Sequence, residues 1–257
     1  MDKKLIFVSY DISDAADPRI VRLSVNFIDD GKIITSLVDP QHPISIHQMS
    51  LHNITNEMVS GKPTLDSTPA YILMRMEPNA IIVGHGIDKI NIIIKNSGGE
   101  PLPNQIIDTH KCLYHATPEE WRSYKLNFVR YALEFDKLNP DADKNDYGYR
   151  TILTKNLFDY LMDEDEMTID DMLMITRNPL IYKKFTFGKY SGKYIDVIAK
   201  EDYQYLKWML DNEMKKVKTN AGDDQTPELL KELFKRNNLI ASLLYYIEKH
   251  KPEEKKD

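Results

Sequence analysis

A carboxylate stands at the end of the first apolar run of the chain. Residues 5–11 (LIFVSYD) are rich in β-branched and aromatic residues, and turn-forming residues follow at Asp14, Asp17 and Pro18. These features predict a strand that delivers Asp11 to its own carboxyl-terminal end. Sites are usually built at that end of a buried strand, because a side chain there is fixed and still open to a cleft. Asp11 is therefore the first candidate catalytic residue.

The chemistry open to such a carboxylate is the binding of a hard divalent cation. Mg²⁺ takes oxygen ligands, so carboxylates cannot be exchanged for hydroxyl groups without losing much of the binding. One carboxylate cannot hold two Mg²⁺ ions. The partners that the rest of the chain supplies to Asp11 therefore decide between an active and an inactive site.

The composition is that of a well-solvated globular protein. The chain has 257 residues, of which 42% are hydrophobic and 29% are charged. No run approaches eighteen apolar residues and the charged start leads into a strand-length run, so we expect neither a membrane span nor a signal peptide. The single cysteine, Cys112, excludes an internal disulfide and indicates a reducing cytoplasm, with a buried structural thiol.

The formal net charge of −6 is unevenly distributed. Acidic residues are in excess before Leu180, and the segment from Leu180 onward carries a slight excess of Lys and Arg. An acidic body does not favour broad electrostatic capture of nucleic acid, but it leaves room for a local basic groove.

The elements that would position Asp11 form an α/β pattern. Strands are predicted at 20–28 and 32–38, joined by an Asp-Gly turn at 29–32. Antiparallel strands that open an otherwise α/β chain predict a mixed sheet flanked by helices. Further strands are predicted at 80–85 and 105–109, and helices at 65–76, 87–95, 125–134 and 150–162, with a short helix capped by Thr55.

The character of the chain changes between Thr176 and Lys184, and we place a domain boundary there. The predicted domains are 1–177, a small α+β module at 178–218, and a linker with a terminal helix at 219–257. The module contains a compact hairpin with glycine turns at 185–195 and an amphipathic helix from about 202 to 216. The terminal helix is predicted from Thr226 to about Lys249, with proline in its first turn.

Several motifs occur in an order that resembles a known family. The strand that ends in Asp11 and the Asp-Gly hairpin are followed by a proline-bounded loop and by residues 51–59 (LHNITNEMV), the most specific signal in the chain. The order continues with Val83-Gly84-His85, Ile107-Asp108-Thr109 and Ser123-Tyr124-Lys125-Leu126. Together, over about residues 4–163, they resemble the DnaQ-like (DEDD) 3′–5′ exonucleases of the RNase H-like fold.

A second resemblance lies in the smaller module. Residues 187–193 (FGKYSGK), with residues 205–209 (YLKWM) downstream, look like the C-terminal module of exodeoxyribonuclease X-type proteins. That module also follows DnaQ-like domains in related bacterial and phage chains. The fold that both resemblances imply is an RNase H-like mixed sheet flanked by helices, followed by a small α+β module and a C-terminal helix.

The resemblance implies two-metal cleavage of phosphodiesters, with metal ions held by an Asp-x-Glu pair, a second Asp and a final Asp. Asp11 matches the first acid, but Ser13 stands for the Glu. The second Asp falls on Lys89, Ile90 or Asn91, depending on a one-residue gap. In the last segment Tyr149 stands for the water-orienting His and Thr154 for the final Asp, so three of four metal ligands are replaced.

The alternative to an inactive site, in which Asp11 is a remnant of the metal centre, is a rearranged metal site. Asp11 and Asp88, with Asp14 or Asp17, could form one, and the cofactor would then be Mg²⁺ or Mn²⁺. We favour the interpretation that these acids are solvated turn residues, that Tyr149 is packed or lies on the surface, and that no metal is bound. His85 is expected to be a strand-end structural histidine rather than a metal ligand, and Asp108 a structural acid. Two further histidines, His47 and His52, are expected in a loop without metal-pair spacing.

The smaller module offers candidate contacts to nucleic acid. Lys189, Tyr190 and Lys193 on the glycine hairpin could contact phosphate and stack a base, and His85 is a further candidate contact. A solvated hairpin with an aromatic packed beneath it is the alternative. Tyr205 and Trp208 are more often core than a stacking platform. The terminal helix either packs on the body or binds a protein partner through its apolar stripe, Leu229, Leu233, Leu239, Leu243, Leu244 and Ile247.

The leading hypothesis is an exonuclease homologue that binds single-stranded or 3′-end nucleic acid, or a protein, without full catalysis. One alternative is an active Mg²⁺-dependent 3′–5′ exonuclease with a rearranged acid set. Another is a structural or assembly protein, for example of a phage or its host, that reuses the nuclease fold. No membrane contact is expected, and the predicted location is the cytoplasm.

Overall fold

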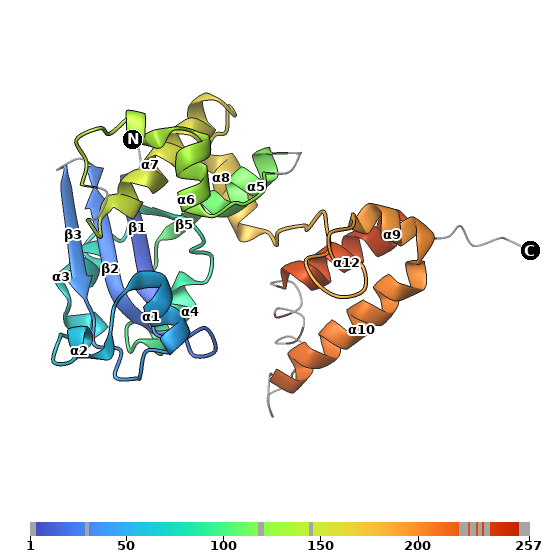
Figure 1. Cartoon of the computed structure of the whole chain (residues 1–257), viewed down its shortest axis with the longest axis horizontal. Coiled ribbons are helices and arrows are strands. Elements are labelled where there is room, and N and C mark those ends of the chain that lie inside the picture. Colours follow the sequence, from blue (N-terminus) through green and yellow to red (C-terminus); the bar gives the residue numbers. More distant parts are fainter. Residues whose placement is uncertain are drawn as a thin grey trace, which may run out of the picture. The chain divides into compact units, whose positions relative to one another are not determined.

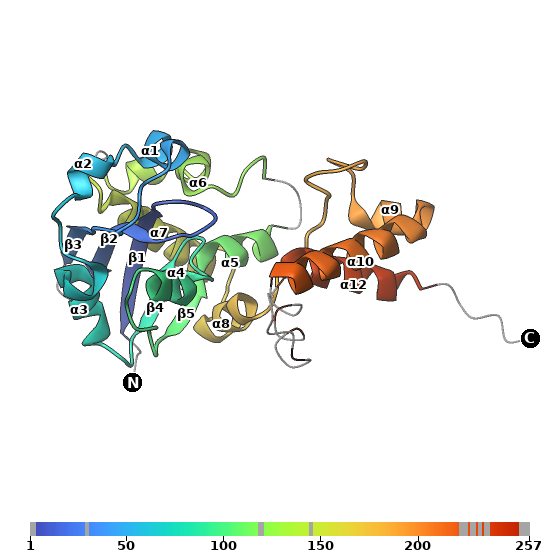
Figure 2. The ribbon, with the colours of Figure 1, turned by 90° about the horizontal axis from the view of Figure 1, so that it is seen from below.

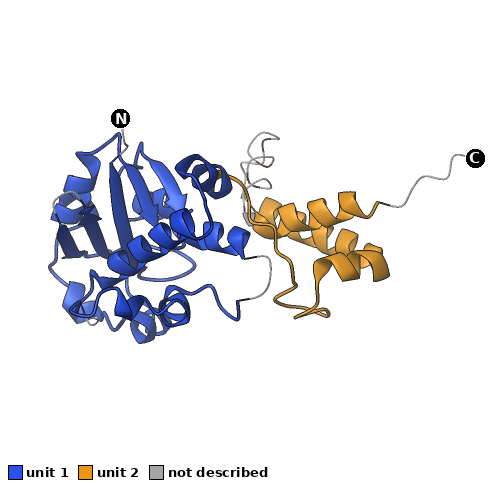
Figure 3. Ribbon diagram, turned by 90° about the horizontal axis from the view of Figure 1, so that it is seen from above, with its two compact units in different colours: residues 1–176 blue, residues 177–257 orange. Residues whose placement is uncertain are grey.

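The computed structural model divides into two compact units, residues 1–176 and residues 177–257 (Figures 1 and 3). It describes residues 4–251 except 29–30, 118–120, 144–145, 221–225, 227–229, 231–232 and 234–236. The predicted Asp-Gly turn therefore lies partly outside the described residues. Gly31 has a φ of +59°, a left-handed conformation that glycine adopts without strain.

Unit 1 is built on one five-stranded mixed sheet with the order β3-β2-β1-β4-β5. The strands β1 (Leu5–Ile12), β2 (Ile20–Phe27) and β3 (Lys32–Leu37) pair antiparallel. The strands β4 (Ile81–Gly84) and β5 (Gln105–Asp108) extend the sheet in parallel, with β4 paired to β1. The carboxyl-terminal ends of β1, β4 and β5 therefore lie at the same edge.

Helices cover both faces of the sheet (Figures 1 and 2). One face packs against α3 (Pro69–Arg75) and α4 (Ile90–Asn96) in a core that contains Ile6, Val8 and Ile82. The other packs against α5 (Thr109–Ala116), α6 (Leu126–Ala132), α7 (Tyr149–Asp163) and α8 (Ile169–Arg177). Successive side chains of β1 point to opposite faces of the sheet and therefore belong to two separate cores.

Short helices complete unit 1: α1 (Ile46–His52), α2 (Asn56–Val59) and two 3₁₀ turns, at Leu65–Ser67 and Phe135–Lys137. The helix predicted at 65–76 is divided, because Thr68 precedes Pro69 and is extended, with φ −83° and ψ 141°. The prediction that His47 and His52 lie in a loop is wrong. Both belong to α1, which Ser45 caps by accepting a hydrogen bond from the backbone N–H of Gln48.

Unit 2 contains α9 (Ile195–Glu201), α10 (Tyr203–Asn220) and α12 (Asn238–Lys249) around one apolar core. The segment expected as a hairpin carries a single isolated bridge, Lys184 with Tyr194, and turns at Gly188 and Gly192. Leu243 of the terminal helix is buried in the core shared with α9 and α10, whereas the adjacent Leu244 is 46% exposed. The helix expected as a separate segment at 219–257 thus packs within unit 2; Leu229 lies outside the described residues.

Among the described residues, no helix combines the length and the apolar character needed to cross a membrane. Cys112 is fully buried on α5, as predicted for a structural thiol. Burial, together with the field of Asp108, raises the pKa of this thiol to about 12, so it is protonated at neutral pH.

Candidate functional site

The candidate site lies at the sheet edge where β1, β4 and β5 end. Asp11 is near the end of β1, His85 follows β4, and Asp108 ends β5. Helix α7 packs on the face of β1 that carries Asp11, and its first turn brings Arg150 to Tyr10 and Asp11 at this edge. The parallel pairing of the three strands is what gathers residues that are far apart in sequence.

Two arginines hold the carboxylate of Asp11. The Nε atom of Arg22 donates to Oδ2 at 2.7 Å, and its Nη2 also contacts that oxygen. Nη1 of Arg150 donates to Oδ1 at 2.8 Å. Each carboxylate oxygen therefore has a guanidinium partner, and the three side chains together carry one net positive charge.

The pairing of Asp11 with Arg22 is built into the sheet. The two residues are directly opposite in the antiparallel register of β1 and β2. The Arg22 side chain is only 7% exposed, and its guanidinium lies 4.1 Å from the centroid of the Tyr147 ring. Its Nη1 is buried and has no hydrogen-bond partner among the residues that the structure describes. A buried cation of this kind needs an anionic neighbour, and Asp11 supplies that charge.

Two serines, Ser9 and Ser13, lie two residues from Asp11, and neither provides a second carboxylate. Ser13 lies beyond β1, is fully buried, and its hydroxyl accepts a hydrogen bond from the backbone N–H of Arg19, which closes the loop after the strand. Ser9 is on the same face of β1 as Asp11 and has the same spacing. Whether the Asp-x-Glu pair is matched to Asp11 and Ser13 or to Ser9 and Asp11, one of its two carboxylates is a serine hydroxyl.

None of the three candidates for the second acid faces Asp11 with an oxygen ligand. Ile90 is the first residue of α4 and is fully buried in the core. Asn91 is engaged with Leu102, whose backbone N–H donates to its Oδ1 and whose carbonyl accepts from its Nδ2. Lys89 stands at the N-cap of α4 and is a cation.

Asp108 organises the loop that carries Asp88. Its Oδ1 accepts hydrogen bonds from the backbone N–H groups of Gly86 and His110, and its Oδ2 accepts one from Asp88. Asp108 is 1% exposed. Burial, followed by the negative charge of Asp108, raises the pKa of Asp88 above its usual value, because both disfavour a second carboxylate there.

Tyr149 and Thr154 are both turned to local partners. The Tyr149 hydroxyl donates to Oδ1 of Asp136 at 2.7 Å, and Arg130 binds both oxygens of the same carboxylate. Burial and the bond to Asp136 raise the pKa of Tyr149 to about 12. Thr154 is buried and donates to the carbonyl of Arg150, one helical turn back.

The residues at this edge do not fit a two-metal centre. Asp11 is already neutralised by two cations, its serine neighbours carry no charge, and Arg22 and Arg150 would repel divalent ions. Among the residues that the structure describes, no three His, Cys, Asp or Glu side chains come together in a way that could hold a metal ion. Asp14 instead folds back to accept from the N–H of Ala16, and Asp17 pairs with Arg19.

His85 is enclosed by hydrogen-bonding partners. Its Nε2 lies 2.7 Å from the carbonyl of Tyr124, which can only accept, so we assign the proton of the neutral ring to Nε2. Its Nδ1 lies 3.1 Å from the Thr109 hydroxyl, and the ring meets His110 edge to face. Burial first, and then the proximity of His110, lower the pKa of His85 to about 3. This environment is that of a neutral structural histidine.

The neutral His85 leads to a pH dependence of stability. Its pKa is about 3 in the folded chain and about 6.5 in the unfolded chain, so only the unfolded chain binds the proton between these values. The free energy of unfolding is therefore expected to fall by about 1 kcal/mol per pH unit as pH drops below about 6, and to gain nothing from this group above pH 6.5. Urea titrations of wild type and His85→Gln between pH 7.5 and 4.5 measure this difference, with the exposed His47→Gln as control. If wild type and His85→Gln lose the same free energy of unfolding over this range, the assignment is contradicted.

Arg22 and Arg150 are the residues of this site that the sequence did not single out, whereas Asp108 was expected as a structural acid. Arg22 could have been identified from the sequence, because a charged residue inside an apolar strand needs a buried partner of opposite charge. Arg150 stands beside Tyr149 in a recognised motif, but its partner lies 139 positions away. Only the tertiary structure brings the two arginines to the same carboxylate.

In unit 2, the predicted contacts cluster on the glycine turns. Lys189 and the Tyr190 hydroxyl both bind Oδ2 of Asp202, at 3.3 and 2.7 Å. The Tyr190 ring packs edge to face on Tyr205, and Lys189 and Lys193 lie over it. Tyr190 is thus packed beneath the turn, while both lysines remain exposed.

The five-stranded order and the helices on both faces are those of an RNase H-like fold, and comparison with known proteins confirms the resemblance to DnaQ-like exonucleases. Residues 185–214 match the family described as exodeoxyribonuclease X-like C-terminal. The chain is 27% identical over 201 residues to exodeoxyribonuclease 10 of Escherichia coli K12, covering 75% of this chain and 84% of that protein.

Two further relatives extend the comparison. The PolC-type DNA polymerase III of Clostridium perfringens is 27% identical over 177 residues, which cover 65% of this chain and 12% of that protein. A solved structure of exonuclease X in complex with 5′ overhanging duplex DNA aligns with a TM-score of 0.51 and 24% identity, over 67% of this chain and 99% of that one. This structural likeness establishes the fold.

Proposed function

We propose that the chain is a 3′–5′ exonuclease homologue that binds nucleic acid without metal-dependent cleavage. The observation that carries the proposal is the capture of the Asp11 carboxylate by Arg22 and Arg150. A metal-dependent nuclease needs this carboxylate free for divalent cations. With both oxygens bound to guanidinium groups, Asp11 acts as a counter-ion that keeps two arginines at the sheet edge.

The same pairing gives the edge an affinity for phosphate. The cluster of Asp11, Arg22 and Arg150 carries one net positive charge, and the Arg150 side chain is 43% exposed. Guanidinium groups bind phosphate oxygens through directed hydrogen bonds, so Arg150 can contact a phosphodiester while it remains close to Asp11. The contact would position a strand without cutting it.

Two other functions remain as alternatives. An active exonuclease with Asp11 and Asp88 as ligands of Mg²⁺ or Mn²⁺ requires both arginines to leave Asp11. A structural or assembly protein that reuses the fold requires no nucleic-acid binding at all. The single buried thiol of Cys112 supports a reducing cytoplasm as the location.

The deciding experiment incubates the full chain with single-stranded DNA labelled at its 5′ end, with Mg²⁺, with Mn²⁺ or with EDTA. We expect binding that weakens as salt rises, with equal affinity under all three conditions and no shortening of the strand. Arg150→Ala is expected to weaken binding several-fold and to reduce its salt dependence, whereas Arg177→Ala serves as the control of equal charge.

Each other outcome selects an alternative. Stepwise shortening from the 3′ end that requires metal and is lost in Asp11→Ala would establish the active exonuclease. Absence of binding to any single-stranded, double-stranded or overhanging DNA or RNA, together with a defined oligomer, would support the structural role.

A further inference from the structure

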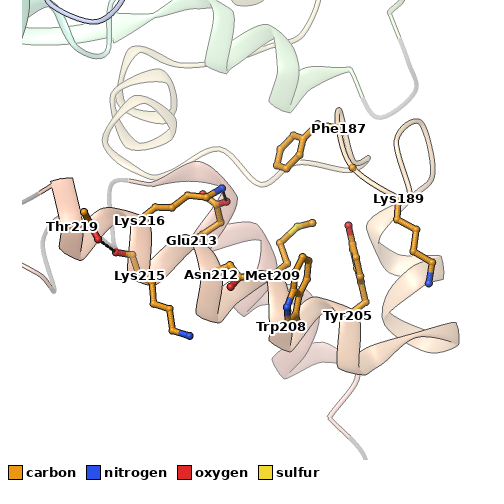
Figure 4. Close-up of a pocket in the computed structure, with 11 residues that line it drawn as sticks. Phe187, Lys189, Tyr205, Trp208, Met209, Asn212, Glu213, Lys215, Lys216 and Thr219 are labelled. Atoms are coloured by element: carbon orange, nitrogen blue, oxygen red, sulfur yellow. Dashed lines mark hydrogen bonds and ion pairs between the residues drawn. The ribbon is translucent and has the colours of Figure 1, made fainter.

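Unit 2 contains a cavity of about 1060 Å³ beside helix α10 (Figure 4). The turn after Phe185 forms one side and the exposed face of α10 forms the other. Its aromatic and apolar lining consists of Phe187, Tyr205, Trp208 and Met209, and its charged lining consists of Lys189, Glu213, Lys215 and Lys216. All of these residues belong to unit 2, so the cavity is complete within that unit.

Exposed aromatic rings distinguish this cavity from the core. Trp208 is 59% exposed and Phe187 is 46% exposed, although burial of such large apolar rings is strongly favourable. The prediction that Trp208 belongs to the core is wrong. The core positions on this part of α10 are Leu206 and Met209, which are 0% and 5% exposed, whereas Trp208 is turned outward.

The rings are arranged as a platform. Tyr205 and Trp208 are one helical turn apart on α10, with ring centroids 5.6 Å apart and planes inclined by 33°. Phe187 faces Met209 and Trp208 from the opposite wall (Figure 4). Tyr205 is itself held by edge-to-face contacts with Phe185 and Tyr190, so the platform has a rigid support.

The rim of the cavity is basic. Three lysines line it against one acid, Glu213, which is paired with Lys216. Lys189 is paired with Asp202 at 3.3 Å and lies over the rings of Tyr190 and Tyr205. No carboxylate partner of Lys215 is found among the described residues, and its side chain is exposed.

We infer that this cavity binds a base of single-stranded nucleic acid, stacked between Phe187 and Trp208, with the adjoining phosphate at Lys215. The occupant must present a planar apolar face to the rings and negative charge to the lysines, and a nucleotide in an unpaired strand has both. A paired base offers no free face, so duplex DNA does not fit. The inference rests on the proposed nucleic-acid binding and assigns it a second contact, in unit 2.

Tryptophan fluorescence provides a direct readout, because the chain has only two tryptophans. Trp121→Phe leaves Trp208 as the single reporter and keeps an aromatic ring beside Phe128. We expect titration of this variant with a single-stranded oligonucleotide of about 12 nucleotides to quench the Trp208 emission. An abasic oligonucleotide of the same length and charge is expected to cause little quenching.

Affinity measurements on the full chain test the same contact. Trp208→Ala is expected to weaken binding of the single strand between about 5-fold and about 140-fold, the range for loss of one stacked base. Tyr245→Ala, an exposed tyrosine of α12 outside the cavity, is the matched aromatic control. Lys215→Ala should reduce the slope of log affinity against log salt by about 0.7, and Lys207→Ala, on the same helix outside the cavity, should leave it unchanged.

The outcomes separate this inference from the proposed function. If wild type binds single strands and Trp208→Ala binds equally well, the cavity is not a base site and the proposed function stands. If wild type binds no nucleic acid, both are wrong. Quenching of Trp208 that follows protein concentration alone, with a rising sedimentation coefficient, would assign the cavity to a second copy of the chain and overturn the inference.

Discussion

Replacing Asp11 with alanine is expected to lower the free energy of unfolding by about 3 kcal/mol or more. The substitution removes the carboxylate that pairs with Arg22, whose side chain is only 7% exposed. Removal of one partner from a buried pair is costly, because the remaining charge keeps its desolvation penalty and loses the attraction that offset it. Arg150, which is 43% exposed, can turn to solvent and adds little.

The sign of this effect distinguishes a counter-ion from a metal ligand. In a metal-free nuclease centre, several carboxylates repel one another, so removal of one would relieve repulsion and leave stability unchanged or higher. Here the neighbours of Asp11 are cations. Urea unfolding without divalent ions therefore gives opposite results for the two descriptions.

Two further variants make the result interpretable. Asp17→Ala removes an ion pair with Arg19 in which both side chains are substantially exposed, and it is expected to cost less than about 1 kcal/mol. Arg22→Met combined with Asp11→Ala also removes the buried guanidinium that the single substitution leaves unpaired, and it should recover much of the lost stability. A loss in Asp11→Ala no larger than in Asp17→Ala would contradict the pairing described above.

The second large effect is expected for Asp108→Ala. The carboxylate accepts three backbone N–H groups, from Gly86, Asp88 and His110, and Asp108 is 1% exposed. Hydrogen bonds to a charged group contribute about 1.5–3 kcal/mol each, and these three are partly buried, so we expect a total loss of about 3 kcal/mol or more. The loop after β4 and the start of α5 should loosen together.

Amide hydrogen exchange locates this loss. Faster exchange is expected at Gly86, Asp88 and His110 in Asp108→Ala, with smaller changes at the distant β2–β3 pair. Asp14→Ala is the control, since Asp14 accepts a backbone N–H of Ala16 on an exposed loop. Unchanged exchange at all three amides would show that Asp108 does not hold the loop.

The sequence allowed most of unit 1 to be predicted. The strands β1 to β5 were expected close to their observed positions, because apolar runs with β-branched residues and turn signals are local features. Helices α1, α5 and α8 were not predicted. Exposed apolar residues such as Ile46 and Leu51 obscure the period of α1, and α5 begins directly at the end of β5 without a turn signal.

The candidate site was only partly predictable. Asp11, Tyr149 and His85 were identified by residue type, position and resemblance. Their roles depended on partners that only folding supplies, namely Arg22 and Arg150 for Asp11, Asp136 for Tyr149, and the Tyr124 carbonyl for His85. In unit 2, a residue count along α10 could not decide whether Trp208 faces the core or solvent.

The sequence by itself placed Asp11 at the end of a central strand, and the resemblance predicts that serine, threonine and apolar or basic residues stand where the DnaQ-like exonucleases carry most of their acids. Residue identity is sufficient for that conclusion, since a hydroxyl cannot supply the charge of a carboxylate. Only the tertiary structure decided that the remaining carboxylate is neutralised. Strand register places Arg22 opposite Asp11, and the packing of α7 on β1 brings Arg150 to its other oxygen. Electrostatic roles depend on distances of a few ångströms between residues that are remote in sequence, and those distances arise only when the sheet and its helices pack.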